Sequence, residues 1–108
     1  VLSGDDALTL PMIALGADGV ISVIGNGYPE SFSRLVATAL KGDFQTAREL
    51  HMQLSPMMSA IFREGNPAGI KAAMACRSLM GTTVRLPLVP ASSGLTDHIR
   101  NLDAALGA

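Results

Sequence analysis

Apolar residues form two kinds of pattern, and the first is found near the start of the chain. Residues 1–3 and 19–27 begin with apolar runs that do not alternate with polar residues, and each run leads into glycine. A strand buried on both faces, as in a parallel sheet, has this pattern. Residues 7–16 between them fit a helix that Asp5 or Asp6 caps and Gly16 ends. This order of strand, helix and strand predicts an α/β fold.

From residue 29 onward the apolar residues recur at the spacing of a helix. The expected helices are 29–42, one from about 43 with a kink at Pro56, 67–81 and 96–106. Asn66 and Pro67 resemble an N-cap followed by proline at the first helical position. Pro87 and Pro90 exclude a helix over residues 84–90, which we expect to form an extended strap. Most of the chain is therefore expected to be helical.

The composition indicates that some apolar surface is covered by another part or partner. Apolar residues make up 48% of the chain and charged residues 16%, whereas globular domains carry about 25% charged residues. The net charge of −1 and the few aromatic residues argue against nucleic-acid binding. No apolar run is long enough for a membrane span. The single cysteine, Cys76, suits a reducing compartment, so a cytoplasmic location is expected.

Few residues qualify as nucleophiles or metal ligands. A Schiff-base lysine needs a desolvated pocket, whereas Lys41 ends a helix and Lys71 lies in the first turns of another. Both lysines and the helical His51 are therefore expected at the surface. No G-x-S-x-G elbow is present, and one cysteine with two distant histidines gives no metal-ligand pattern. We predict no catalytic residue, no metal site and no cofactor.

The strongest candidate for a binding site is the loop Ser3-Gly4-Asp5-Asp6. Ligands of α/β folds bind at the carboxyl ends of the strands, and the glycine-bearing loops after Ser3 and Ile24 both lie at that end. The alternative is that the two aspartates only cap the following helix, and the local pattern alone favours this alternative.

Three stretches together resemble the C-terminal part of the dihydrodipicolinate synthase family, which belongs to the pyruvate-dependent Schiff-base aldolases and lyases. They are "LSGDDALTLPMIALGADGVISV" at 2–23, "EGNPAGIKAAM" at 64–74 and "VRLPLVP" at 84–90. The resemblance implies a partial (β/α)8 TIM barrel. Residues 1–41 would be its last two βα units, and residues 42–108 a C-terminal α-helical region. More than half of the enzyme would then lie upstream of this chain.

The resemblance also implies a function. The family condenses pyruvate with aspartate semialdehyde through a lysine Schiff base, in lysine and diaminopimelate biosynthesis. Its catalytic lysine and tyrosine lie on upstream strands, so this chain alone would be inactive. The backbone carbonyl of Ile21 would face pyruvate, and Gly4, Asp5 and Asp6 would meet the aldehyde.

Other interpretations stay open on the sequence. The chain could be a non-catalytic helical module for assembly or binding, or part of another pyruvate-dependent aldolase of the same superfamily. The expected partners are further copies of the chain, in a homo-oligomer, or the missing N-terminal part of the barrel.

Overall fold

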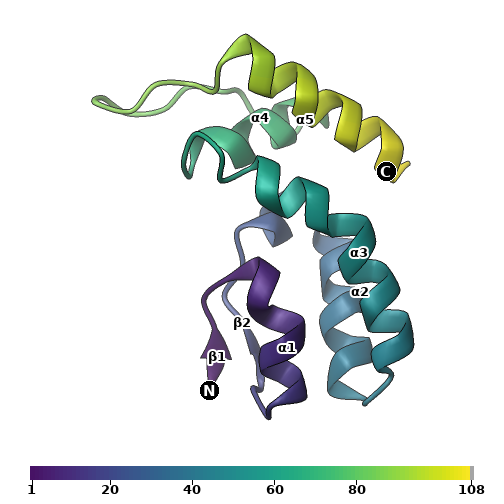
Figure 1. Ribbon diagram of the computed structural model, residues 1–108. Coiled ribbons are helices and arrows are strands. Elements are labelled where there is room, and N and C mark those ends of the chain that lie inside the picture. Colours follow the sequence, from purple (N-terminus) through teal and green to yellow (C-terminus); the bar gives the residue numbers. More distant parts are fainter. Residues whose placement is uncertain (108) are drawn as a thin grey trace. The chain divides into compact units, whose positions relative to one another are not determined.

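The computed structural model describes residues 1–107, which are mostly helical with one two-stranded sheet (Figure 1). The chain divides into two compact units. The first is Val1–Ser55, and the second begins at Pro56. The expected combination of a small parallel β part with many helices is confirmed at this level.

The first unit contains the sheet and the helix that connects its strands. Strand β1 (Leu2–Ser3) pairs in parallel with β2 (Gly19–Val20), with Leu2 opposite Gly19 and Ser3 opposite Val20. The 3-10 helix η1 (Asp6–Leu8) and helix α1 (Thr9–Ala14) make the connection. Gly16, with a φ of 108°, follows α1 as its expected stop.

The predicted strand over 19–27 is wrong in its length, because β2 ends at Val20 and the 3-10 helix η2 (Ile24–Asn26) follows. The backbone N–H groups of Val23 and Ile24 bond to a side chain of the preceding loop instead of to a neighbouring strand. The predicted burial of both strand faces is also wrong, because Ile21, inside the predicted range, is 72% exposed.

Two further helices begin in the first unit, and the second of them continues across the unit boundary at Pro56. Helix α2 (Pro29–Leu40) begins with proline at its first position, as predicted, and buries Phe32, Leu35 and Ala39. Helix α3 (Phe44–Ala60) continues through Pro56. A small core joins α1, α2 and the start of α3; its buried members are Ile13, Ala17, Ala39 and Ala47, with Leu10, Met12 and Val36 packed against them.

In the second unit, α4 (Ala68–Cys76) packs against α5 (Ser93–Leu106). The expected bounds of α4 are wrong at both ends. Pro67 is the N-cap and Asn66 is not, and the helix ends five residues before Gly81. Its C-terminal turn is closed by Ser78 in the left-handed region, where the Ser78 and Leu79 amides donate to carbonyls of the last turn. Because glycine normally takes this place, no stop signal for the helix is recognisable in the sequence here.

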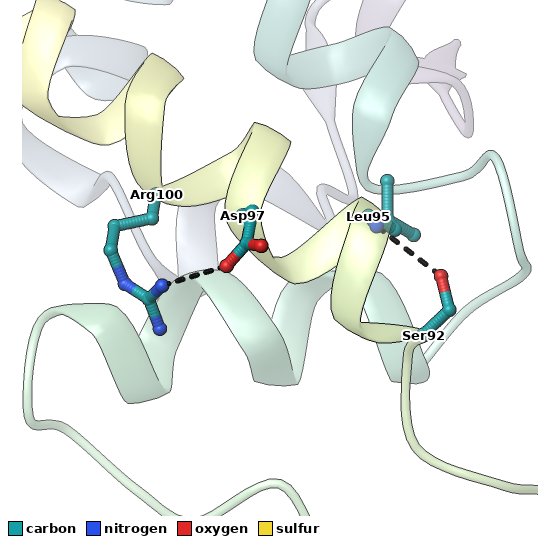
Figure 2. Close-up of polar contacts among 4 residues, drawn as sticks. All are labelled: Ser92, Leu95, Asp97 and Arg100. Carbon is teal, nitrogen blue, oxygen red and sulfur yellow. Dashed lines mark hydrogen bonds and ion pairs between the residues drawn. The ribbon is translucent and has the colours of Figure 1, made fainter.

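Helix α5 begins three residues earlier than expected. The Ser92 hydroxyl caps it by accepting a hydrogen bond from the Leu95 amide at 3.2 Å (Figure 2). The Glu64 carboxylate in turn accepts two hydrogen bonds from Ser92, from its amide at 2.8 Å and its hydroxyl at 2.5 Å. Figure 2 also shows Arg100 paired with Asp97 at 2.9 Å, a contact too exposed to stabilise much.

The loop between α4 and α5, residues 77–92, contains neither helix nor strand, as the prolines predict for residues 84–90. The strap, residues 84–90, and the residues just before it expose large apolar side chains: Leu79, Met80, Leu86, Leu88 and Val89.

Gly69 in α4 offers a test of the packing in the second unit. A Cβ atom at this position would overlap the backbone carbonyl of Ile61, so Gly69→Ala should lower the free energy of unfolding by about 2–4 kcal/mol. Gly94 in α5 is the matched control, because its Cβ would meet open space. Gly94→Ala should raise stability by up to about 1 kcal/mol, since alanine favours helix. Urea unfolding of both variants measures the difference, and equal effects would contradict this close helix contact.

Glu64 should make the stability of the second unit depend on pH. Hydrogen bonds from the Ser92 side chain and backbone hold the pKa of Glu64 below its ordinary value. The stabilisation is therefore complete above the unfolded-state pKa and is lost as the pH falls through the lowered folded-state pKa. Glu64→Gln should unfold at lower urea concentration at neutral pH and lose this difference as the pH falls below the lowered folded-state pKa of Glu64. The exposed Glu49→Gln is the control; a Glu64→Gln effect that stays constant with pH would contradict the assignment.

Candidate functional site

The candidate site lies where β1 and β2 both end. Gly4 and Asp5 follow β1 and are exposed, and Ile21 follows β2 and is exposed as well. The Ile21 amide donates a hydrogen bond to the Ser3 carbonyl at 2.9 Å, which holds the two loops side by side. The sequence predicts the loops after Ser3 and Ile24 at this edge, whereas the structure brings together the loops after Ser3 and Val20.

Side chains of the first loop fix its shape. The buried Ser3 hydroxyl donates to the Asp5 carbonyl at 2.8 Å and accepts from the Asp5 amide at 3.1 Å. Thr9 Oγ1, also buried, lies 2.9 Å from the same carbonyl and 3.2 Å from Ser3 Oγ. The backbone at Gly4 is consequently held in an ordered turn, with open space where a side chain would stand.

Asp5 and Asp6 are neighbours in sequence but have opposite surroundings. Asp5 is exposed and caps η1, with its Oδ1 accepting from the Ala7 amide at 3.0 Å. Capping, the alternative that the pattern favoured, is thus part of what Asp5 does. Within residues 1–107 its second carboxylate oxygen makes no hydrogen bond and is open to solvent or a ligand.

Asp6 is turned inward and only 3% exposed. Its Oδ1 accepts from the Ser22 hydroxyl at 2.6 Å, and its Oδ2 accepts from the amides of Ile24 at 2.8 Å and Val23 at 3.3 Å. A buried carboxylate needs such donors, because burial without them costs several kcal/mol or more. Asp6 therefore lies beneath the site, whereas Gly4, Asp5 and Ile21 lie on its surface.

Ser22 is a site residue that the sequence analysis did not single out. Its hydroxyl donates to Asp6 and accepts from the Gly25 amide at 2.9 Å, so it shapes the turn after β2. The available signal was one hydroxyl residue inside the apolar run "VISVI". Such a residue in a buried strand end needs a polar partner, and the two preceding aspartates are the nearest candidates.

The candidate nucleophiles lie away from these two loops in the sequence, and the expected surface position is confirmed for Lys41 and wrong for Lys71 and His51. Lys41 is exposed at the C-terminus of α2, as expected. Lys71 is half-buried, since its Nζ donates to the Thr83 carbonyl at 2.5 Å. His51 is also half-buried, because it shares a helical stripe with the buried Ala47 and Leu54.

Within residues 1–107, no group of three or more histidine, cysteine, aspartate or glutamate side chains could hold a metal ion. Over the same residues, every helix is too short or too polar to pass through a bilayer.

An open groove lies beside the site, on the face formed by the sheet and α2. Its volume is about 500 Å³. Its lining is mostly apolar and includes Leu2, Val20, Phe32, Val36 and Leu40. Leu2 and Leu40 are more than half exposed, at 55% and 51%. This groove is a surface that another polypeptide could cover.

Comparisons with known proteins agree with one another. The sequence model of the dihydrodipicolinate synthetase family matches residues 1–106. The 4-hydroxy-tetrahydrodipicolinate synthase of Phocaeicola vulgatus is 51% identical over 90 residues, covering 83% of this chain and 30% of that protein. The enzyme of the same name from Methanocaldococcus jannaschii is 46% identical over 107 residues, covering 99% of this chain and 37% of that protein.

Solved structures give the same result. The dihydrodipicolinate synthase of Thermotoga maritima superposes with a TM-score of 0.96 at 39% identity, covering 99% of this chain and 36% of that one. The Aquifex aeolicus enzyme gives 0.94 at 42% identity, with the same two coverages. The chain thus spans about a third of the length of its relatives, from 30% to 37%. Over that third, sequence and backbone both place it in one group: the chain belongs to the dihydrodipicolinate synthetase family.

Proposed function

We propose that this chain forms part of a lyase that condenses pyruvate with aspartate semialdehyde through a lysine Schiff base, in lysine and diaminopimelate biosynthesis. The observation that carries the proposal is the pair of exposed loops at the carboxyl ends of β1 and β2. Ligands of parallel α/β folds bind at this end of the strands. Family membership supplies the reaction class, since the relatives are named for 4-hydroxy-tetrahydrodipicolinate synthesis.

In this proposal, residues 1–41 are the last two βα units of a (β/α)8 TIM barrel, and residues 42–108 are the helical region that follows. The alternation of β1, α1, β2 and α2, with the two strands parallel, supports this assignment. A non-catalytic helical module is disfavoured, because it has no use for a parallel strand pair that leaves apolar side chains exposed.

The site residues would position substrates. The Ile21 carbonyl makes no hydrogen bond within residues 1–107, so it can accept one from an N–H or O–H group on the pyruvate side of the site. Gly4 and the free carboxylate oxygen of Asp5 would meet the incoming aldehyde. Such contacts contribute by orienting the reactants.

The covalent chemistry would come from a different part of the enzyme. Lys71 is engaged with the Thr83 carbonyl, and Lys41 is exposed at a helix end, outside the desolvated pocket that a Schiff-base lysine needs. We therefore propose that neither lysine forms the imine and that this chain alone is inactive. A cytoplasmic location fits the single cysteine of the chain.

The proposed partner is the portion of the enzyme that relatives carry outside the matched third. It would cover the groove between the sheet and α2, continuing the sheet beside β2. The apolar lining and the half-exposed Leu2 and Leu40 support this role.

Reconstitution tests the proposal directly. The chain is mixed with the portion of the Methanocaldococcus jannaschii enzyme that does not match it. The mixture is treated with pyruvate and borohydride, and both chains are weighed by intact-mass spectrometry. We expect a complex in which only the complementary chain gains the mass of a reduced pyruvate imine. The 11.2 kDa chain should stay unmodified.

Two variants serve as a matched pair for this experiment. Leu40→Glu places a charge in the groove and should weaken the complex by about tenfold or more, since a buried unpaired charge is costly. Met52→Glu changes a 65% exposed methionine of α3 outside the groove and should have no effect. An adduct on the 11.2 kDa chain would make Lys41 or Lys71 the nucleophile. Self-association without a complex would replace the proposed partner with a second copy.

A further inference from the structure

The buried carboxylate of Asp6 has a consequence for the exposed peptide group between Ile21 and Ser22. Within residues 1–107, neither the Ile21 carbonyl nor the Ser22 amide makes a hydrogen bond. Because β2 has already ended at Val20, no strand ladder fixes this peptide plane. Its orientation must therefore be set by the anchors on either side of it.

Those anchors are one residue away in each direction. On one side the Ile21 amide donates to the Ser3 carbonyl at 2.9 Å. On the other side the Ser22 hydroxyl donates to Asp6 at 2.6 Å, and the Ile24 amide donates to the same carboxylate at 2.8 Å. A charged acceptor gives stronger hydrogen bonds than a neutral one, and burial strengthens them further. Asp6 is the charged acceptor of this second anchor, and the Gly25 amide adds a hydrogen bond to the Ser22 hydroxyl at 2.9 Å.

We propose that Asp6 is a positioning residue: through Ser22 and Ile24 it fixes the Ile21–Ser22 peptide so that the Ile21 carbonyl points into the substrate site. This inference rests on the proposed function for the role of that carbonyl. The resemblance implies that Asp6 contacts the substrate; in this proposal Asp6 instead supports the carbonyl that makes the contact. It also explains why two adjacent aspartates differ so much in exposure, since Asp5 faces outward and Asp6 holds the second loop.

The first test uses the chain itself and does not require activity. Asp6→Asn puts an amide N–H₂ or a weaker acceptor against three donors, and Ser22→Ala removes one of these donors. Both should shift the carbonyl-carbon resonance of Ile21 in NMR spectra. Asp6→Asn should also speed hydrogen exchange at the Ile24 amide by about tenfold or more. Asp18→Asn is the matched control, because the Asp18 side chain is 78% exposed and pairs with the Val1 amino group, away from residues 21–24.

Resonances of residues 21–24 that stay unchanged in both variants would overturn the proposal. Asp6 is more deeply buried than Ser22, so Asp6→Asn is the variant that could fail to fold. In that case the Ile21 resonance of Ser22→Ala decides the test. Ser22→Thr keeps the hydroxyl and should restore the wild-type Ile21 resonance. If Ser22→Ala acted only by lowering the stability of the whole chain, restoring the hydroxyl in Ser22→Thr would not selectively restore the Ile21 resonance.

The second test uses the reconstituted complex. Ser22→Ala should lower kcat/KM for pyruvate by about tenfold, and Ser22→Thr should recover it. An unchanged kcat/KM would overturn the positioning role. If the wild-type complex forms no pyruvate adduct, the proposed function fails instead. The NMR result still decides whether Asp6 fixes the orientation of the Ile21–Ser22 peptide.

Discussion

The first unit depends on one buried charge, the Asp6 carboxylate. Its parallel strands share only two residue pairs, Leu2 with Gly19 and Ser3 with Val20, which is too little pairing to fix two loops. Asp6 adds three hydrogen bonds from the turn after β2. Desolvating a carboxylate is costly, and these donors offset the cost only in one geometry. The sheet can therefore be short while its exposed end stays ordered.

Polar groups also fix the chain at the helix ends of the second unit. Ser92 caps α5, and Glu64 holds Ser92 through both its amide and its hydroxyl. Ser78 closes α4 in a left-handed turn. Between these two anchors the chain crosses sixteen residues without helix or strand, from 77 to 92. The long loop thus has defined start and end points although its middle has no regular structure.

Local spacing predicted the parts of the fold that local forces determine. Helix α2 could be predicted from its stripe of Phe32, Leu35 and Ala39, and the order of elements placed the loop after Ser3 at the carboxyl end of the sheet. The end of β2 and the inward turn of Asp6 were not visible. Both result from hydrogen bonds between residues 16 to 18 positions apart, which no periodic pattern encodes. The end of α4 was missed because serine takes the place usual for glycine.

The exposed strap limits the colloidal stability of the isolated chain. Leu86 and Val89 are 89% and 68% exposed, and a net charge of −1 provides almost no repulsion between molecules. Apolar attraction strengthens on warming from the cold and in sulfate or phosphate salts. Solubility should therefore be greatest in the cold and at low salt, and it should improve as the pH moves away from the sequence pI of about 6.1. Purification conditions for the chain follow from the apolar side chains of the strap.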